Sequence, residues 1–239
     1  MPHSAQLHWD YRDGRVAAVA AAIVYSLWVL EAVLPGGGAV QGALADQGTT
    51  FARFMESAHR TGAVLVMLTA GLGLGLGARE ETGHLLAASW WCMAVFGAAS
   101  LAATLFPGPC LVSTDVACAA ESLTEGLPGA TVAQAVLAAL ALLAALASVV
   151  VLAVDRWRQG DRSWPLVAVL ALLQLLAAAA LLVMAVRVYA AGGDGEPGAV
   201  FGVLQRAHLV TVSLWLLAAG LLPRLWRRTP SAPRTGASH

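Results

Sequence analysis

Charged residues are scarce in this chain of 239 residues: they make up 12% of it, against about 25% in a typical soluble domain. Lysine is absent, so all fourteen basic residues are arginine. The acidic residues are equally numerous, and the formal net charge of zero gives no basis for nucleic-acid binding. With 59% hydrophobic residues, so few charges cannot cover a water-facing surface, whereas a lipid bilayer accommodates them. The composition therefore predicts an integral membrane protein.

Six apolar runs are long enough to cross the hydrocarbon core of a bilayer, which takes about 20 helical residues. The runs are continuous rather than alternating, which favours helices over barrel strands. The first run follows a polar segment of mixed charge without a clean cleavage site, so we read it as a retained helix rather than a signal peptide. The sequence predicts an all-α bundle, residues 15–222, with six transmembrane helices at 15–34, 57–78, 84–106, 130–154, 164–191 and 201–222.

The distribution of arginine predicts the orientation, because basic loops stay in the cytoplasm. Six spans place both termini on one side, and that side holds ten arginines: Arg12, Arg15, Arg79, Arg156, Arg158, Arg162, Arg224, Arg227, Arg228 and Arg234. The loop at 107–128 on the other side is acidic and has no base. We therefore expect a cell-membrane protein with residues 1–14 as a cytoplasmic tail and residues 223–239 as a basic, disordered cytoplasmic tail.

Cysteine is also scarce, with three residues in the chain. Cys110 and Cys118 belong to the loop that we place outside the cytoplasm, where an oxidising compartment lets cysteines pair. A disulfide between them would close a small ring, and two free thiols are the alternative. Cys92 lies within the third predicted span, where a thiol packs as a small apolar side chain.

The run GLGLGLG at 71–77 has the composition of a nucleotide-binding loop. That fingerprint requires a preceding strand and the start of a helix, whereas these glycines lie inside an apolar span. Gly71 and Gly75 are four residues apart, as are Gly73 and Gly77, which makes two strips of helix surface without side chains. We expect both strips to admit a neighbouring helix closely.

Ionisable groups near apolar spans indicate function, because their burial is costly unless they are paired or hydrated. In the predicted topology seven such groups from four helices lie toward the outer side and would line one cavity: Glu31, Glu56, His59, Arg60, Arg187, Arg206 and His208. Spacing puts Glu56, His59 and Arg60 on one face of the second span, where Glu56 and Arg60 can form an ion pair. One face of the sixth span consists of Gln205, His208, Thr211 and Trp215.

A structural role is the alternative for each of these groups. Arginines near span ends can extend to lipid headgroups, and Glu31 paired with one of them would only fasten two helices. Each histidine taken alone favours a helix–helix hydrogen bond over metal ligation. Two histidines and a glutamate suffice in number for a metal, but they come from three helices without the spacing of a ligand set. We therefore expect no metal and no cofactor.

Three stretches form a pattern that we find together in one family: LADQGTTFARFMESAHRTGAVLV, LFPGPCLVSTDVAC and GVLQRAHLVTVSLW. They resemble the bacterial membrane family called domain of unknown function 998, whose members have six spans. The chain departs from that family at Gly108, where relatives often carry an acidic residue, and in GATVAQAV, where relatives carry a histidine. The resemblance implies a bacterial membrane location and this architecture, and it implies no activity.

We expect first a protein that binds an amphipathic small molecule or a lipid headgroup in an outward-facing polar cavity. Arginine suits an anionic group because guanidinium binds it bidentately. The expected ligand-binding residues are Arg60, Arg187, Arg206, Gln205, Glu56 and Trp215. Membrane lipid is then a partner, and nucleic acid is not.

Two other classes of function stay open. An intramembrane enzyme, a cyclase or a lipid-modifying enzyme, would use Glu31 as acid and His59 or His208 as base. A structural or regulatory subunit would use the same polar groups only to fasten helices. Active transport ranks below these, because the inner half of the predicted spans is almost entirely Ala, Leu and Val apart from Gln174 and Ser148.

Overall fold

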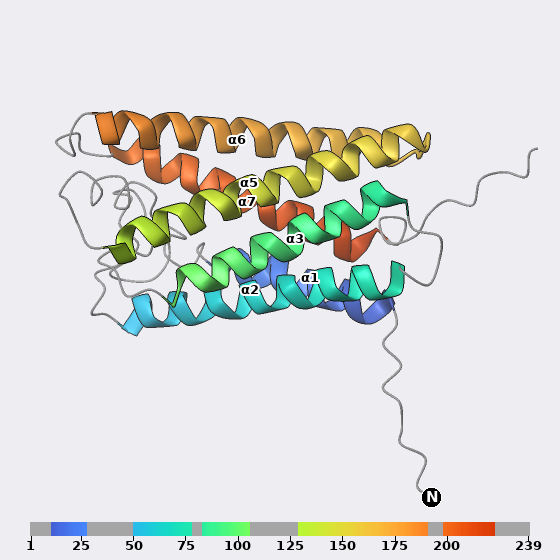
Figure 1. Cartoon of the computed structure of the whole chain (residues 1–239), viewed down its shortest axis with the longest axis horizontal. Helices are drawn as coiled ribbons and strands as arrows, with labels where there is room; N and C mark the ends of the chain where they lie inside the picture. The colour runs from blue at the N-terminus through green and yellow to red at the C-terminus, as the bar shows by residue number, and fades with distance from the viewer. Residues whose placement is uncertain (1–10, 28–49, 78–82, 106–128, 191–197, 223–239) are drawn as a thin grey trace, which may run out of the picture.

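The structure, a computed structural model, describes residues 11–27, 50–77, 83–105, 129–190 and 198–222. Every regular element in these ranges is a helix, in the order α1 (Tyr11–Tyr25), α2 (Thr50–Gly77), α3 (His84–Ala103), α5 (Gly129–Arg158), α6 (Trp164–Ala190) and α7 (Gly198–Leu221) (Figure 1). The all-α class predicted from the sequence is confirmed for this part of the chain.

The observed helix bounds agree closely with the predicted spans. α1 begins at Tyr11, four residues before the predicted first span, and α2 begins at Thr50, seven residues before the second. α1 ends at Tyr25, nine residues before the predicted end of the first span, and residues 28–34 of that span lie outside the described residues. All other bounds differ by four residues or fewer. α1 and α2 therefore begin in polar sequence, a turn or more before their apolar runs. A search for apolar runs does not detect such polar first turns.

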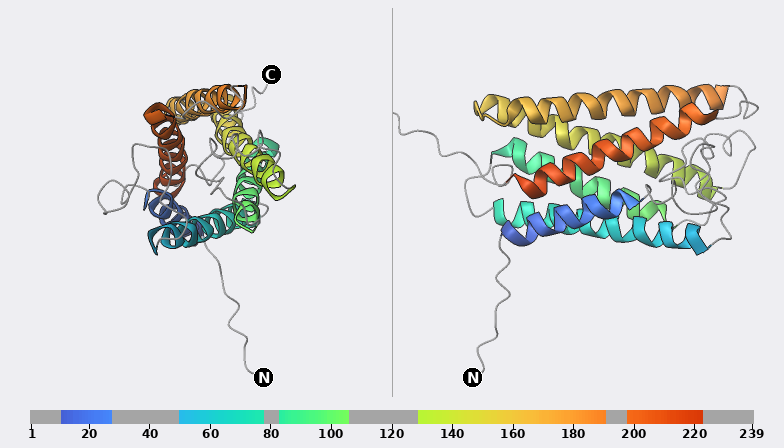
Figure 2. Two further views of the ribbon diagram at one scale, coloured as in Figure 1. Left: turned by 90° about the vertical axis from the view of Figure 1, so that its left-hand side faces the viewer. Right: turned by 180° about the vertical axis from the view of Figure 1, so that it is seen from behind.

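The helices form a closed ring in which each one packs against its neighbours in the chain and α1 packs against α7 (Figure 2). Their directions alternate, so that α1 begins and α7 ends at the same end of the bundle (Figure 1). We call this the terminal end and the other the opposite end. An even number of alternating helices is what the sequence predicts for two termini on one side, although the side of a membrane is not fixed by the bundle itself.

The outer surface of the ring is apolar on every helix. Examples at least half exposed are Val16, Val64, Trp91, Leu143 and Leu176. Three helical segments are long and apolar enough to cross a membrane: His84–Ala103, Val132–Arg158 and Trp164–Arg187. In water such a continuous apolar surface would drive association, whereas in lipid it carries no penalty. The coarse prediction of a membrane protein fits this surface.

One of the two predicted glycine strips is a close helix contact. A Cβ added at Gly73 would lie 2.5 Å from the indole ring of Trp90, so the absence of a side chain lets α2 and α3 pack around this tryptophan. The prediction is wrong for the strip of Gly71 and Gly75, where an added Cβ meets nothing within 4 Å. Both strips have the same spacing along α2. Which of them packs against a neighbouring helix depends on the side of α2 that faces α3, and Gly73 lies on that side while Gly71 and Gly75 do not.

Arg15 fastens the ring where it closes at the terminal end. Its Nε lies 2.6 Å from the carbonyl oxygen of Gly220, and its Nη2 lies 3.1 Å from that of Leu221. These are carbonyls of the last turn of α7, which have no partner within their own helix and carry its partial negative charge. An added Cβ at Gly220 would collide with Val19, so α1 and α7 approach closely here.

The connection between α5 and α6 buries a charged side chain. α5 continues to Arg158, four residues past the end of the predicted span, and Arg156 in this extension has no exposed surface. Its guanidinium lies 3.5 Å from a carboxylate oxygen of Asp155 and 3.5 Å from one of Asp161. Gly160, with a φ of +63°, turns the chain so that Asp161 comes back to Arg156. Buried charge is tolerated here because it is paired.

Candidate ligand-binding site

A cavity lies inside the bundle between α3, α5, α6 and α7. Its enclosed volume is about 20 Å³, enough for a water molecule or a methyl group, and it reaches about 280 Å³ only when the open space at its mouth is counted. The lining is almost entirely carbon, and it consists of Met93, Phe96, Ala145, Ser148, Val149, Gln174, Val212, Trp215 and Leu216. A cavity of this character favours an apolar chain or ring over an ion.

Trp215, a residue of the cavity wall, has a hydrogen-bond donor that is unused within the described residues. The side chain is 8% exposed and packs edge-on against Trp90, with ring centroids 6.4 Å apart. Trp90 in turn packs against α2 at Gly73, so the contact with Trp90 restricts the indole of Trp215. Its buried Nε1 has no hydrogen-bond partner in the described part of the chain. An indole N–H only donates, so its natural partner is an acceptor such as an ether, ester or carbonyl oxygen.

A polar network joins α6 to α7 beside this cavity. Nε2 of Gln174 lies 3.0 Å from Nδ1 of His208, and the hydroxyl of Thr211 hydrogen-bonds to Oε1 of Gln174. The same hydroxyl lies 2.7 Å from the carbonyl oxygen of His208. The amide Nε2 can only donate, so Nδ1 of His208 accepts and the proton of the neutral imidazole is on its Nε2. All three side chains are buried.

Ser148, the other polar residue in the cavity wall, is also bonded. Its hydroxyl donates to the carbonyl oxygen of Ser89 at 2.8 Å, and the hydroxyl of Ser89 donates to the carbonyl oxygen of Ser148 at 2.8 Å. This reciprocal pair joins α3 and α5 at a point where both serines are buried. Because the polar groups of Gln174 and Ser148 already have partners, the cavity offers an occupant little besides carbon and the indole N–H.

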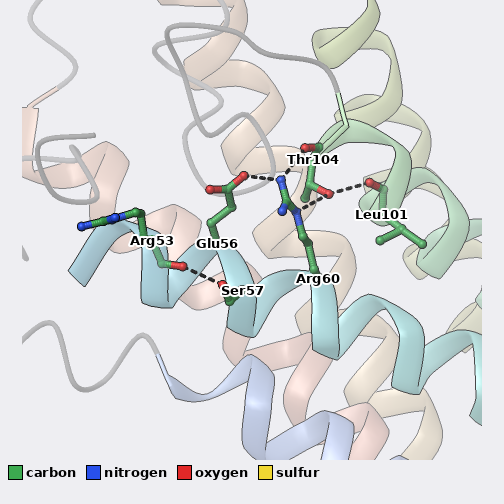
Figure 3. Close-up of polar contacts among 6 residues, drawn as sticks. All are labelled: Arg53, Glu56, Ser57, Arg60, Leu101 and Thr104. Atoms are coloured by element: carbon green, nitrogen blue, oxygen red, sulfur yellow. Dashed lines mark hydrogen bonds and ion pairs between the residues drawn. The ribbon is translucent and has the colours of Figure 1, made fainter. Parts of the chain in front are cut away.

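Arg60 binds the last turn of α3 at the opposite end of the bundle (Figure 3). Its Nη2 lies 2.5 Å from Glu56 and 3.1 Å from the carbonyl oxygen of Thr104, while its Nε lies 3.3 Å from the Thr104 hydroxyl. Thr104 is the C-terminal cap of α3, so the guanidinium neutralises the partial negative charge of that helix end. The predicted ion pair of Glu56 and Arg60 is confirmed. The bonds to Thr104 therefore join α2 to the end of α3.

His59 faces away from that cluster, between α1 and α2. Its ring stands edge-on to the phenol of Tyr25, with centroids 5.4 Å apart, and Tyr25 also contacts Phe96 at 5.8 Å. Nε2 of His59 and the hydroxyl of Tyr25 are buried and have no hydrogen-bond partner in the described ranges. His59 is therefore in aromatic surroundings, separate from the guanidinium of its neighbour Arg60.

The single polar cavity expected from the sequence stays a prediction, and its expected residues have different neighbours where the structure describes them. Arg60 is bonded to a helix end, Arg187 is exposed, and Arg206 is half-buried near the start of α7. His59 and His208 lie in different helix interfaces. Helix direction explains these different neighbours, because groups at one depth can lie on different faces of their helices.

Three candidates lie outside the described residues, namely Glu31, Cys110 and Cys118, and so does the side chain of Gln205. The disulfide and the acid role of Glu31 stay predictions. Cys92, which the structure does describe, is a free cysteine, partly buried in α3. Within the described ranges, no three His, Cys, Asp or Glu side chains come together in the arrangement of a metal site.

Gln174 and Thr211 are the residues whose importance the sequence understated. Gln174 stands alone among apolar residues of α6, and a lone amide in such a segment is a signal for an interhelical hydrogen bond. His208, Thr211 and Trp215 share a buried face of α7, as their spacing predicts. The sequence does not show that this face meets Gln174, because the pairing of α6 with α7 is a tertiary contact.

No protein family, curated protein or solved structure matches the chain.

Proposed function

We propose that this is an integral membrane protein of six spans that binds an apolar or amphipathic small molecule in the cavity between α3, α5, α6 and α7. The apolar outer surface of every helix and the three long apolar segments support the membrane location. The cavity with its buried indole N–H supports the binding role. Cytoplasmic termini and membership of the family called domain of unknown function 998 belong to the same proposal.

The single observation behind this function is the carbon-lined cavity that contains Trp215. Burial of apolar surface stabilises a bound chain by about 25 cal/mol per Å². A single acceptor oxygen next to Trp215 would add a hydrogen bond worth about 1 kcal/mol and fix the orientation of the molecule. The enclosed volume of about 20 Å³ suits the end of an apolar chain that enters through the open mouth, rather than a whole molecule. This replaces the anionic headgroup expected from the sequence, since the cavity wall has no arginine.

Native mass spectrometry of the protein released from membranes tests this function. We expect a bound small molecule on the wild type and its loss from Ala145→Leu, because Ala145 lines the cavity and a leucine would fill it. The matched control is Ala139→Leu, which adds the same volume to an exposed position of the same helix. Absence of any adduct from the wild type, or its full retention by Ala145→Leu, would overturn the proposal.

A second variant separates binding from folding. Trp215→Phe keeps an aromatic ring against Trp90 but removes the N–H, so we expect a folded protein that binds its ligand about five-fold more weakly, the equivalent of one hydrogen bond. A C-terminal fluorescent reporter that matures only in the cytoplasm tests the orientation. A dark fusion that is still made in full would place the C-terminus outside.

A further inference from the structure

Tyr25 and His59 form a second polar feature that the cavity does not use. Tyr25 is 6% exposed, near the end of α1, and His59 stands against it from α2. The hydroxyl of Ser100 on α3 is near enough to the phenol to act on it as a weak hydrogen-bonding neighbour, but no hydrogen bond of normal geometry joins the two groups. Two buried polar atoms on touching rings, Oη of Tyr25 and Nε2 of His59, thus have no partner in the described part of the chain.

Such unpaired groups are expensive, because each loses its water and gains no hydrogen bond, at a cost of about 1–3 kcal/mol. Nearby apolar contacts do not offset this: Phe96 packs against the ring of Tyr25, and Gly62 lets α2 approach it closely, with an added Cβ 2.9 Å from the ring. The close packing places the two polar atoms and keeps the side chains from turning away. The pair therefore has the character of a binding site rather than a packing defect.

The depth of this pair in the bundle indicates the chemistry of its occupant. Ser100 is one helical turn before Thr104, the residue at which Arg60 binds the end of α3. The exposed ion cluster of Arg60 and Glu56 is at the level expected for lipid headgroups, and Tyr25 and His59 lie just beneath it. That is the zone in which the hydroxyl and ester oxygens of lipids and other amphiphiles reside.

We propose that Tyr25 and His59 bind the hydroxyl group of an uncharged amphiphile between α1, α2 and α3. A neutral imidazole and a phenol can each donate or accept one hydrogen bond. An alcohol also does both, so one hydroxyl satisfies both side chains at once, whereas an ether satisfies only one of them. A carboxylate or an ammonium group is disfavoured, since neither side chain takes part in an ion pair of the described ranges. The inference depends on the membrane location proposed above and not on the cavity.

Imidazole ¹⁵N NMR of the full chain in lipid nanodiscs tests this site with decan-1-ol as the probe and 1-methoxydecane as its matched analogue without a donor. We expect decan-1-ol to shift the His59 Nε2 resonance saturably and 1-methoxydecane to bind about five-fold more weakly or worse. Tyr25→Phe keeps the ring contacts and should weaken decan-1-ol binding by the same factor. Thr69→Val, which removes a buried hydroxyl elsewhere on α2, should leave binding unchanged.

Three results would overturn the proposal. One is a His59 resonance that decan-1-ol does not shift, which indicates an ordered water only. Another is equal binding of the alcohol and its ether, and the third is unchanged binding in Tyr25→Phe. Failure of the cavity proposal is distinguishable, because Ala145→Leu fills the cavity and should leave the His59 titration intact.

Discussion

Nε2 of Gln174 lies 3.0 Å from Nδ1 of His208, and this contact ties α6 to α7 in the interior of the bundle. The two residues are 34 positions apart, and Gln174 stands in an otherwise apolar stretch. Their bond fixes the tautomer of the imidazole, and Thr211 completes the network by binding the amide oxygen. The site thus depends on hydrogen bonds that are protected from water, where an unpaired group is costly.

Gln174→Leu should destabilise the protein by about 1–3 kcal/mol, because Nδ1 of His208 and the hydroxyl of Thr211 lose their common partner while they stay buried. The measurement is thermal unfolding in detergent. The triple variant Gln174→Leu, His208→Leu and Thr211→Val removes every member of the network and should recover part of the loss. Equal stability of wild type and Gln174→Leu would contradict the role of the network.

Gly73→Ala and Gly71→Ala form a matched pair on α2. The first places a methyl group 2.5 Å from the ring of Trp90, so we expect a loss of about 1–3 kcal/mol in the free energy of unfolding. The second meets nothing within 4 Å and gains helix propensity, so it should be neutral or stabilising by up to about 1 kcal/mol. Unfolding of both variants under the same conditions checks the difference, and the reverse order would refute the packing described for Trp90.

Arg60→Ala should cost about 0.5–1.5 kcal/mol of stability, because the end of α3 loses its bound guanidinium. This loss of stability is smaller than that expected for a fully buried interaction, since the Arg60 side chain is 46% exposed and solvent partly screens its charge. Glu56→Gln removes only the ion pair and should cost less.

Arg53→Ala is the control for Arg60. Both arginines are on α2, but the side chain of Arg53 points away from the cluster and only its backbone carbonyl accepts a bond, from Ser57 (Figure 3). Thermal unfolding of the three variants should rank them with Arg60→Ala the least stable. If Arg53→Ala costs as much, then general surface charge, not the bond to Thr104, sets the stability.

Asp161 should give the protein an acid-sensitive part of its stability. Burial would raise the pKa of this carboxyl group, but the hydrogen bond from the backbone N–H of Ser163 and the charge of Arg156 outweigh burial and hold the pKa below its ordinary value of 3.8. A lowered folded-state pKa means that the contribution is complete above that ordinary value and is lost as the pH falls through the folded-state pKa. The Asp161 contribution therefore disappears only in strong acid.

Asp161→Asn tests that dependence. At neutral pH the variant should be less stable, because the buried Arg156 loses one of its two carboxylates. The difference from wild type should shrink as the pH falls below 3.8. Unfolding by guanidinium chloride at a series of pH values measures it, and a difference that does not vary with pH would show that Asp161 acts through its hydrogen bonds to the turn alone.

The ends of most helices could be predicted from the sequence, because a run of apolar residues of a given length is a local property. The pair of Glu56 and Arg60 was predictable for the same reason, since four residues along one helix bring two side chains together. The burial of Arg156 was not predictable, because its position next to a turn of polar sequence is typical of a solvated loop. The glycine strips show the same limit: their spacing was visible, and the helix that covers Gly73 was not.

For the part of the chain that the structure describes, the sequence by itself determined the all-helical architecture, the approximate bounds of most helices and the apolar outer surface, because each follows from composition and local periodicity. Only the tertiary structure decided which polar groups meet: Gln174 with His208, Arg60 with the end of α3, and Tyr25 with His59. The physical reason is that a helix surrounded by lipid is apolar on nearly every side, so its sequence does not mark the face that turns inward.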